Sequence, residues 1–160
     1  MHRLSTLLLL CALAAAPARA AQCSGAPAEL AAAAAAWSLP ETTAGTPVDA
    51  SIPYRVMLGS PVTAGFTFRA KPENEGQFAA AFAFRAAAGG EYAVIVGQRM
   101  WIDVVDERGR ALVPERVERG LRCDGIAKTL VFALTPGSYR LQLSEGASPS
   151  TRVLVAPLRK

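Results

Sequence analysis

The stretch "QFAAAFAFRA", residues 77–86, alternates large and small side chains. Its three phenylalanines, Phe78, Phe82 and Phe84, fall on one side together with Ala80. The opposite side carries Ala79, Ala81, Ala83 and Arg85. Successive side chains of a β-strand point to opposite faces of a sheet, so a strand with one buried face repeats every two residues. This stretch therefore predicts a β-strand whose phenylalanines face a core.

The rest of the second half of the chain has the same character. Short runs rich in β-branched and aromatic residues are separated by Gly, Pro and Asn clusters, which is typical of an all-β sandwich or barrel. The predicted strands, about eight, are "IPYRVML" (52–58), "VTAGFTFRA" (62–70), "QFAAAFAFRA" (77–86), "EYAVIVG" (91–97), "RMWIDVV" (99–105), "IAKTLVFAL" (126–134), "SYRLQLS" (138–144) and "TRVLVAP" (151–157). We predict an all-β fold, an antiparallel, jelly-roll-like β-sandwich over residues 51–160.

The segment before these strands, residues 21–50, has a different composition. "PAELAAAAAAW" contains strong helix formers, and Pro40 would stop a helix soon afterwards. We predict a short helix from about Ala28 to Trp37, followed by an extended loop. Because an alanine run buries little, Trp37 is the expected anchor of the helix on the domain. A poly-alanine linker without defined structure is the alternative, since alanine alone specifies no packed face.

The first twenty residues, "MHRLSTLLLLCALAAAPARA", have the three parts of a secretory signal peptide: a short positive start, an apolar run and an A-x-A cleavage site. The apolar run is shorter than the ~20 residues that a membrane-spanning helix needs. We expect cleavage after Ala20 and a periplasmic or extracellular protein without a membrane span. A lipoprotein is the alternative, disfavoured because Gln22 rather than a small residue precedes Cys23.

Cleavage would remove His2, the only histidine. A chain without histidine cannot build a Ser-His-Asp triad, a Cys-His pair or a histidine-ligated zinc or iron site. No S-x-x-K spacing for a Ser-Lys dyad occurs either. Cleavage also removes Arg3 and Arg19, which leaves fifteen basic and thirteen acidic residues and a net charge of +2. We therefore expect no catalytic residues, no cofactor and no nucleic-acid partner.

Two cysteines would remain, Cys23 and Cys123, and an even pair in an oxidising compartment predicts a disulfide. The closed loop spans about a hundred residues, for which the chain-entropy model gives roughly 4–5 kcal/mol of stabilisation. A reactive thiol or a metal thiolate is the alternative, disfavoured by two distant cysteines without a histidine. In "RCDGIAK", the pair Asp124-Gly125 predicts a turn between Cys123 and a buried strand.

A resemblance rests on "GGEYAVIV", "WIDVVDERGR" and "LTPGSYRLQLS". Their order of strand, polar hairpin, strand and Pro-Gly turn resembles the bacterial pre-peptidase C-terminal domains, which are secreted jelly-roll-like sandwiches, over residues 78–157. That resemblance implies an accessory module without an active site. "WIDVV" and "CDGIAKTLVFALTPGSYRLQLS" are also similar to small secreted proteobacterial proteins, some of which carry the name homogentisate 1,2-dioxygenase. The genuine dioxygenase is similar to a cupin whose iron is held by histidines and a glutamate.

Two sets of side chains are candidates for a ligand surface. Trp101 lies on the mixed face of its strand and would offer a stacking platform for a sugar, although packing in the core or at an edge is the simpler interpretation. The arginines between the predicted strands would form an anion-binding patch, or else a solvated loop neutralised by interleaved glutamates. They are Arg108, Arg110, Arg116, Arg119 and Arg122.

Four acidic residues are candidate calcium ligands: Asp103, Asp106, Glu107 and Asp124. No D-x-D-x-D-G spacing is present, and "DERG" is typical of a hairpin turn in which Gly109 takes a positive φ. We therefore expect no metal site. The sequence favours a non-enzymatic binding or accessory module of the cell envelope, with a protein, an envelope component or a carbohydrate as partner. The alternative is an enzyme with the dioxygenase activity.

Overall fold

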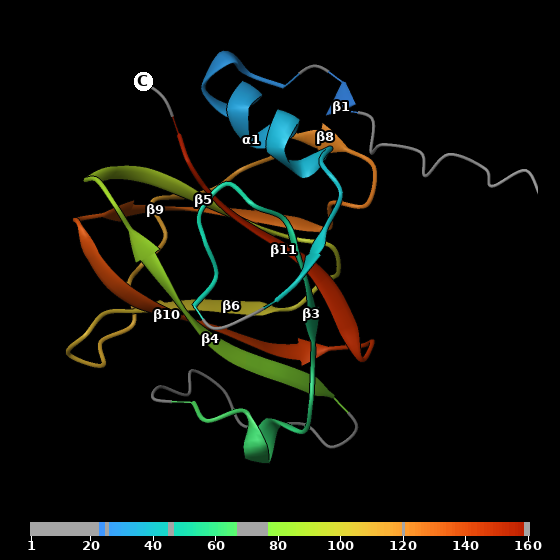
Figure 1. Cartoon of the computed structure of the whole chain (residues 1–160), viewed down its shortest axis with the longest axis vertical. Coiled ribbons are helices and arrows are strands. Elements are labelled where there is room, and N and C mark those ends of the chain that lie inside the picture. Colours follow the sequence, from blue (N-terminus) through green and yellow to red (C-terminus); the bar gives the residue numbers. More distant parts are fainter. Residues whose placement is uncertain (1–22, 25, 45–46, 67–76, 120, 159–160) are drawn as a thin grey trace, which may run out of the picture.

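The computed structural model describes residues 23–24, 26–44, 47–66, 77–119 and 121–158. Strands dominate this part of the chain, and one α-helix lies near its start (Figure 1). The all-β class predicted from the sequence is confirmed. The predicted signal peptide, residues 1–20, lies outside the described residues. Within them, no helix has the length and apolar character needed to cross a membrane.

Two sheets form a sandwich. The smaller contains β4 (Phe78–Ala86), β6 (Trp101–Val105) and β10 (Gly137–Gly146). The larger contains β2 (Thr42–Thr43), β3 (Tyr54–Met57), β5 (Gly90–Val96), β7 (Arg116–Val117), β9 (Lys128–Leu134) and β11 (Ser150–Pro157). Their strand orders are β4-β10-β6 and β2-β3-β11-β5-β9-β7. All neighbouring strands are antiparallel except β2 and β3, which are parallel.

The predicted aromatic face of β4 lies between the sheets. Phe82 and Phe84 are buried in the core there, and Phe78 packs against it. The ring of Phe84 stacks on Tyr139, its partner on β10, with ring centroids 5.6 Å apart. Aromatic pairs across strands stabilise a sheet in addition to the area they bury. The period-two interpretation of residues 77–86 is therefore confirmed.

The two central strands of the larger sheet, β5 and β11, are buried on both faces. Their inward residues join the sandwich core, whereas Ala93, Ile95 and Leu154 point outward into a second apolar cluster. The outer cover of that cluster is a 3-10 turn, η1 (Ala28–Leu30), that continues into helix α1 (Ala31–Trp37). Figure 1 shows α1 on the opposite side of the larger sheet from β4, β6 and β10. The predicted helix is confirmed and the linker alternative is wrong.

The alanines of α1 bury more than the sequence suggested. Ala33, Ala34 and Ala36 are all buried, because short side chains allow the helix to lie close to the sheet. Trp37 nevertheless provides the anchor that was predicted, with no exposed surface. Its Nε1 donates a hydrogen bond to the carbonyl oxygen of Asp124 at 3.1 Å.

Arg152, on β11, holds the C-terminal end of α1. Its guanidinium lies 4.7 Å from the centroid of the Trp37 ring and donates to the carbonyl oxygens of Trp37 and Leu39. The last carbonyls of a helix have no donor within the helix, and a cation there also interacts favourably with the helix dipole. The contact between Trp37 and Arg152 therefore joins the helix to the sheet through both packing and hydrogen bonds.

Cys23 and Cys123 form a disulfide, which is the pairing expected from the sequence. They lie opposite each other in a two-stranded ladder of β1 (Cys23–Ser24) and β8 (Arg122–Cys123). The turn predicted after Cys123 is also present, with Gly125 at a φ of +77°. The bridge therefore ties the segment that leads into the helix to the segment that leads into β9.

One predicted strand is wrong in its first part. Residues 61–66 are not a strand: Pro61–Thr63 form the 3-10 turn η2, and the chain then continues as a loop. The side-chain oxygen of Ser60 accepts a hydrogen bond from the N–H of Val62, and Pro61 occupies the first position of the turn. Both residues favour a helical start over an extended strand. The remaining residues of that prediction, 67–70, lie outside the described residues.

Segments predicted as loops supply the edges of the larger sheet. Thr42–Thr43 pairs with β3, and Arg116–Val117 pairs with β9. Val48 also forms a bridge with Phe84 on the smaller sheet. Very short edge strands limit the number of unpaired backbone groups that a sheet presents to other chains. β7 ends at Val117, so it covers only part of the edge of β9.

Candidate functional site

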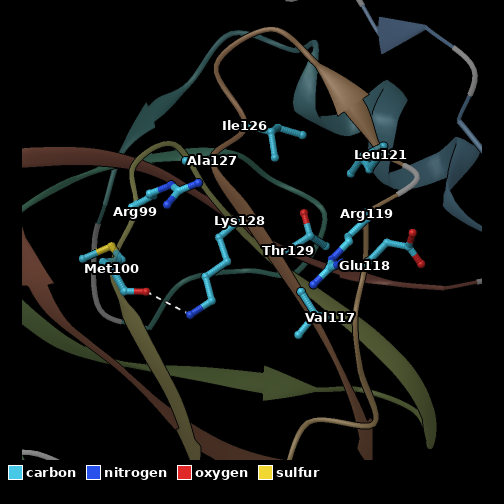
Figure 2. Close-up of a pocket in the computed structure, with 10 residues that line it drawn as sticks. All are labelled: Arg99, Met100, Val117, Glu118, Arg119, Leu121, Ile126, Ala127, Lys128 and Thr129. Carbon is cyan, nitrogen blue, oxygen red and sulfur yellow. Dashed lines mark hydrogen bonds between the residues drawn. The ribbon is translucent and has the colours of Figure 1, made fainter.

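A pocket of about 540 Å³ opens where β9 begins. Three segments form it: the turn between β5 and β6, the chain that leaves β7, and the start of β9 (Figure 2). We call it the basic pocket, and its lining residues are Arg99, Met100, Val117, Glu118, Arg119, Leu121, Ile126, Ala127, Lys128 and Thr129. Its volume is in the range of sites that bind small molecules.

Three cationic side chains surround this pocket: Arg99, Arg119 and Lys128. Arg99 and Arg119 are exposed, and neither makes an ion pair or side-chain hydrogen bond to any residue of the described ranges. The Lys128 Nζ donates to the carbonyl oxygen of Met100 at 3.1 Å, which directs the ammonium group toward the β5–β6 turn. Concave surfaces lined by one sign of charge concentrate the electrostatic potential. The pocket is therefore suited to an anion.

Glu118 is the acidic residue of the pocket lining. Its Oε2 lies 3.5 Å from the Nε of Arg116, a residue that lies outside that lining. Figure 2 shows the Glu118 carboxylate directed away from Lys128 and Arg99. Counting formal charges, the lining carries three positive groups and one negative group. Arg116, which lies outside the lining, compensates the charge of Glu118, so the pocket keeps its basic character.

Thr129 adds a hydroxyl group to the pocket. The residue is only 2% exposed, and its Oγ1 has no hydrogen-bond partner within the part of the chain that the structure describes. A buried hydroxyl without a partner costs free energy, and a ligand that supplies an acceptor would remove that cost. The pocket thus combines two exposed arginines and Lys128 with one buried hydroxyl donor on a strand.

Trp101 lies beside the basic pocket but is not part of its lining. It is half-buried on β6, an edge strand of the smaller sheet, and its Nε1 donates to Asp103 at 3.1 Å. The Lys128 Nζ lies 5.5 Å from the centroid of its ring. Burial raises the pKa of Asp103, while the hydrogen bond from Trp101 and the charge of Lys128 oppose that rise. Trp101 is thus packed at an edge and linked to the pocket through Lys128.

The arginines that the sequence grouped together do not share one surface. Arg119 lines the basic pocket, whereas Arg122 lines a different hollow of about 640 Å³ beside the disulfide. Arg108 and Arg110 line a third hollow of about 320 Å³ at the hairpin after β6. These four arginines therefore lie in three different hollows and do not form the single patch considered from the sequence.

Two of these arginines are neutralised by neighbouring acids. Arg116 pairs with Glu91 at 2.7 Å and with Glu29 at 3.5 Å, and the hydrogen bond that it donates to Glu91 is the main reason that its pKa is raised. Arg110 pairs with Asp106 at 2.8 Å. The backbone N–H of Arg110 is the main cause of the lowered pKa of Asp106. Neutralisation was the alternative expected for these arginines, but Glu91 and Glu29 come from β5 and η1 rather than from the loop, and of the interleaved glutamates only Glu118 pairs with Arg116, at 3.5 Å, among the described residues.

Two of the candidate calcium ligands, Asp106 and Glu107, accept hydrogen bonds from backbone N–H groups. Asp106 caps the predicted hairpin turn, which contains Gly109 at a φ of +77°, and Glu107 accepts a hydrogen bond from the N–H of Ser138. In the described segments, no three side chains among His, Cys, Asp and Glu come together as metal ligands would.

Sequence reasoning assigned no ligand-binding role to Arg99, Lys128 or Thr129. Arg99 follows Gln98 at the turn into β6, and the basic residues of the pocket, Arg99, Arg119 and Lys128, come from three different segments of the sequence. No spacing within one strand could reveal them. The useful signal was local: Lys128 is a cation at the first position of an otherwise buried strand.

Comparisons with known proteins give a likeness to solved structures but no match by sequence. No protein family matches the sequence, and no curated protein matches it. Among solved structures, the pre-peptidase C-terminal domain of a collagenase from Bacillus anthracis is similar, with a TM-score of 0.44 and 12% sequence identity. The match covers 73% of this chain and 97% of that chain. It is a domain of the kind that the sequence pattern resembles.

Proposed function

We propose that the protein is a secreted, non-enzymatic binding module of the cell envelope, and that the basic pocket binds anionic groups of an envelope polymer. The observation that carries this proposal is the convergence of Arg99, Arg119 and Lys128 from three segments on one pocket of about 540 Å³. Secretion is supported by the signal-peptide pattern of residues 1–20. A disulfide between Cys23 and Cys123 is also typical of an oxidising compartment.

Binding rather than catalysis is supported by the chemistry of the lining. The nucleophile of a hydrolase is activated by an adjacent base, commonly a histidine. His2 is the only histidine of the chain and belongs to the predicted signal peptide. The lining instead offers cations and one hydroxyl, which are groups that hold an anion without reacting with it. The alternative dioxygenase activity needs histidines around iron, and a cleaved chain has none to supply.

The first experiment measures binding to anionic and neutral polymers. Protein purified from the periplasm of an expressing bacterium is titrated with polygalacturonate, dextran sulfate and neutral dextran by calorimetry. We expect binding to at least one of the anionic polymers, weaker at high salt because counterions screen the charges, and none to neutral dextran. Trp101 fluorescence should report the same binding, since Lys128 connects its ring to the pocket.

The variants decide whether the basic pocket is responsible. The double variant Arg99→Gln/Arg119→Gln should lower the affinity at least tenfold, since charged hydrogen bonds contribute about this much each. The control Arg108→Gln/Arg122→Gln also removes two charges, from hollows other than the basic pocket, and is therefore matched in charge. Equal losses in the control and in the double variant would show only general attraction to a basic protein. Absence of binding to both anionic polymers would overturn the proposal.

The enzyme alternative has its own measurement. Purified protein is analysed for metal content and for oxygen uptake in the presence of homogentisate. We expect neither bound iron in stoichiometric amount nor uptake above the rate without protein. Stoichiometric iron together with oxygen uptake would replace the binding proposal with the dioxygenase activity.

A further inference from the structure

The basic pocket extends across the edge of a strand. Lys128 and Thr129 are consecutive residues of β9, so their side chains point to opposite faces of the sheet. Figure 2 shows Arg99 on the same side as Lys128, and Arg119 on the same side as Thr129. The pocket therefore has two parts: one beside Arg99 and Lys128, and the other beside Arg119 and Thr129.

The edge between the two parts is open because β7 is short. β7 pairs with β9 only at Leu130 and Val131. The N–H of Glu118 still donates to the carbonyl oxygen of Thr129 at 3.0 Å, and the chain then leaves toward Leu121. An extended ligand could pass this point from one face of the sheet to the other, along a strand edge that β7 no longer covers.

Size and charge both exceed what one small anion requires. A water molecule occupies about 30 Å³ of the liquid, so a pocket of about 540 Å³ holds far more than a single carboxylate or phosphate. Three cations are present against Glu118, which Arg116 compensates from outside the lining. A single monoanion could face only one of Arg99 and Arg119, and the other arginine would keep no ion-pair partner among the described residues.

We infer that the basic pocket binds two anionic groups of one ligand at once, one against Arg99 and Lys128 and the other against Arg119 and the Thr129 hydroxyl. The ligand class is a polyanion with repeating acidic groups, such as an acidic polysaccharide or a polyphosphate. This inference rests on the proposed function, and it adds the number of charges recognised and the residues that recognise each of them.

The test is a length series in two acid chemistries. One series is galacturonic acid, its dimer and its trimer, and the other is phosphate, pyrophosphate and tripolyphosphate. When a second group binds within the same molecule, the affinity rises through effective concentration, by roughly 10- to 100-fold in a favourable geometry. We expect such a step between the monomer and a longer member of at least one series, and that series identifies the acid.

Single variants show whether the two parts act on different groups. Arg99→Gln and Arg119→Gln should each remove most of the gain with length, about tenfold for the longer ligand. Each should lower the affinity for the monomer by no more than about twofold, because the monomer can still use the other part. Arg108→Gln should change neither value, because it lies in a different hollow.

Thr129→Val is the most specific variant, because it removes the hydroxyl and keeps the shape. The Thr129 Oγ1 has no partner within the described ranges, so the unfolding free energy should stay equal or rise. The affinity for the longer ligand should nevertheless fall, by roughly threefold or more. Unchanged affinity in this variant would remove Thr129 from the inference.

Three results would count against these proposals. If monomers and trimers bind equally tightly in both series, the two-part inference is overturned while the anion-binding proposal remains. If no member of either series and no anionic polymer binds, the proposed function itself is wrong. Equal losses for monomer and trimer in both arginine variants would also overturn the inference, since they would indicate one shared position.

Discussion

Arg152 and Arg119 carry the same side chain, but the fold surrounds them differently. Arg152 lies against the ring of Trp37 and donates to two carbonyl oxygens at the end of α1. Burial removes part of the solvent around its guanidinium and lowers its pKa, although it remains a cation at any physiological pH. Arg119 is exposed at the basic pocket and has no side-chain partner in the described ranges.

This difference separates cations that stabilise the fold from cations that are available to a ligand. Arg152 donates to two carbonyl oxygens within the chain, so removing its donors should affect folding. The guanidinium groups of Arg99 and Arg119 donate to no other described residue, so removing them should affect binding alone. Four sets of substitutions test this difference. They differ in how much of the packed structure they remove.

Trp37→Ala should have the largest effect. It removes a fully buried aromatic side chain, the hydrogen bond to Asp124 and the surface on which Arg152 packs. Large-to-small changes of this kind cost about 3–5 kcal/mol. Denaturant unfolding should measure that loss. Trp101→Ala, at a half-buried edge position, is the control and should cost clearly less; equal losses would contradict the assignment of Trp37 as the main anchor.

Replacing both cysteines should come next. Cys23→Ser/Cys123→Ser opens a bridge that closes a loop across 100 positions, and loss of such a bridge typically costs about 2–5 kcal/mol. Unfolding of the variant should be compared with that of the oxidised protein. Mass analysis without reductant tests the premise, because two free thiols in periplasmic protein would show that the bridge is not formed there.

Arg152→Gln should destabilise the protein by about 1.5–3 kcal/mol, the range for hydrogen bonds from charged groups. The loss should be visible as a lower denaturant midpoint with an unchanged slope. Arg55→Gln is a suitable comparison, because Arg55 forms an exposed ion pair with Glu41, which is typically worth under about 1 kcal/mol. If the two variants lose the same stability, Arg152 has no special role at the helix end.

Arg99→Gln and Arg119→Gln should have the smallest effect on stability, within about 0.5 kcal/mol of the unchanged protein. The reason is that neither side chain contributes a bond within the described fold. Thermal and denaturant unfolding of the same protein samples used for binding provide the measurement. A loss above about 1 kcal/mol would mean that these arginines pack or pair in solution, and it would weaken the distinction from Arg152.

Much of the fold could be predicted because its signals are local. Alternation along residues 77–86 predicted the inner face of β4, and the continuous apolar run of β5 is typical of a strand buried on both faces. Pro61 shows the limit of such reasoning. The residues after it have strand-like composition, but a proline at the first position and the Ser60 side chain favour a 3-10 turn.

The candidate site could be predicted only in part. Arg119 was identified as part of an anion-binding group, but its four companions in that prediction are elsewhere or are neutralised. The true neighbours, Arg99 and Lys128, come from a turn and from the first residue of a strand. Sequence proximity is a poor guide here, because antiparallel strands bring distant positions together at the ends of a sandwich.

The fold class, the strand faces, the short helix with Trp37 as its anchor and the pairing of Cys23 with Cys123 could all be predicted from the amino-acid sequence alone. Each of these depends on the period of side chains along one segment or on a count of residues. Only the tertiary structure decided which face of the sandwich the helix covers and which cations share a pocket. Those features depend on the order of strands in each sheet, which is set by packing between distant segments and leaves no local pattern in the chain.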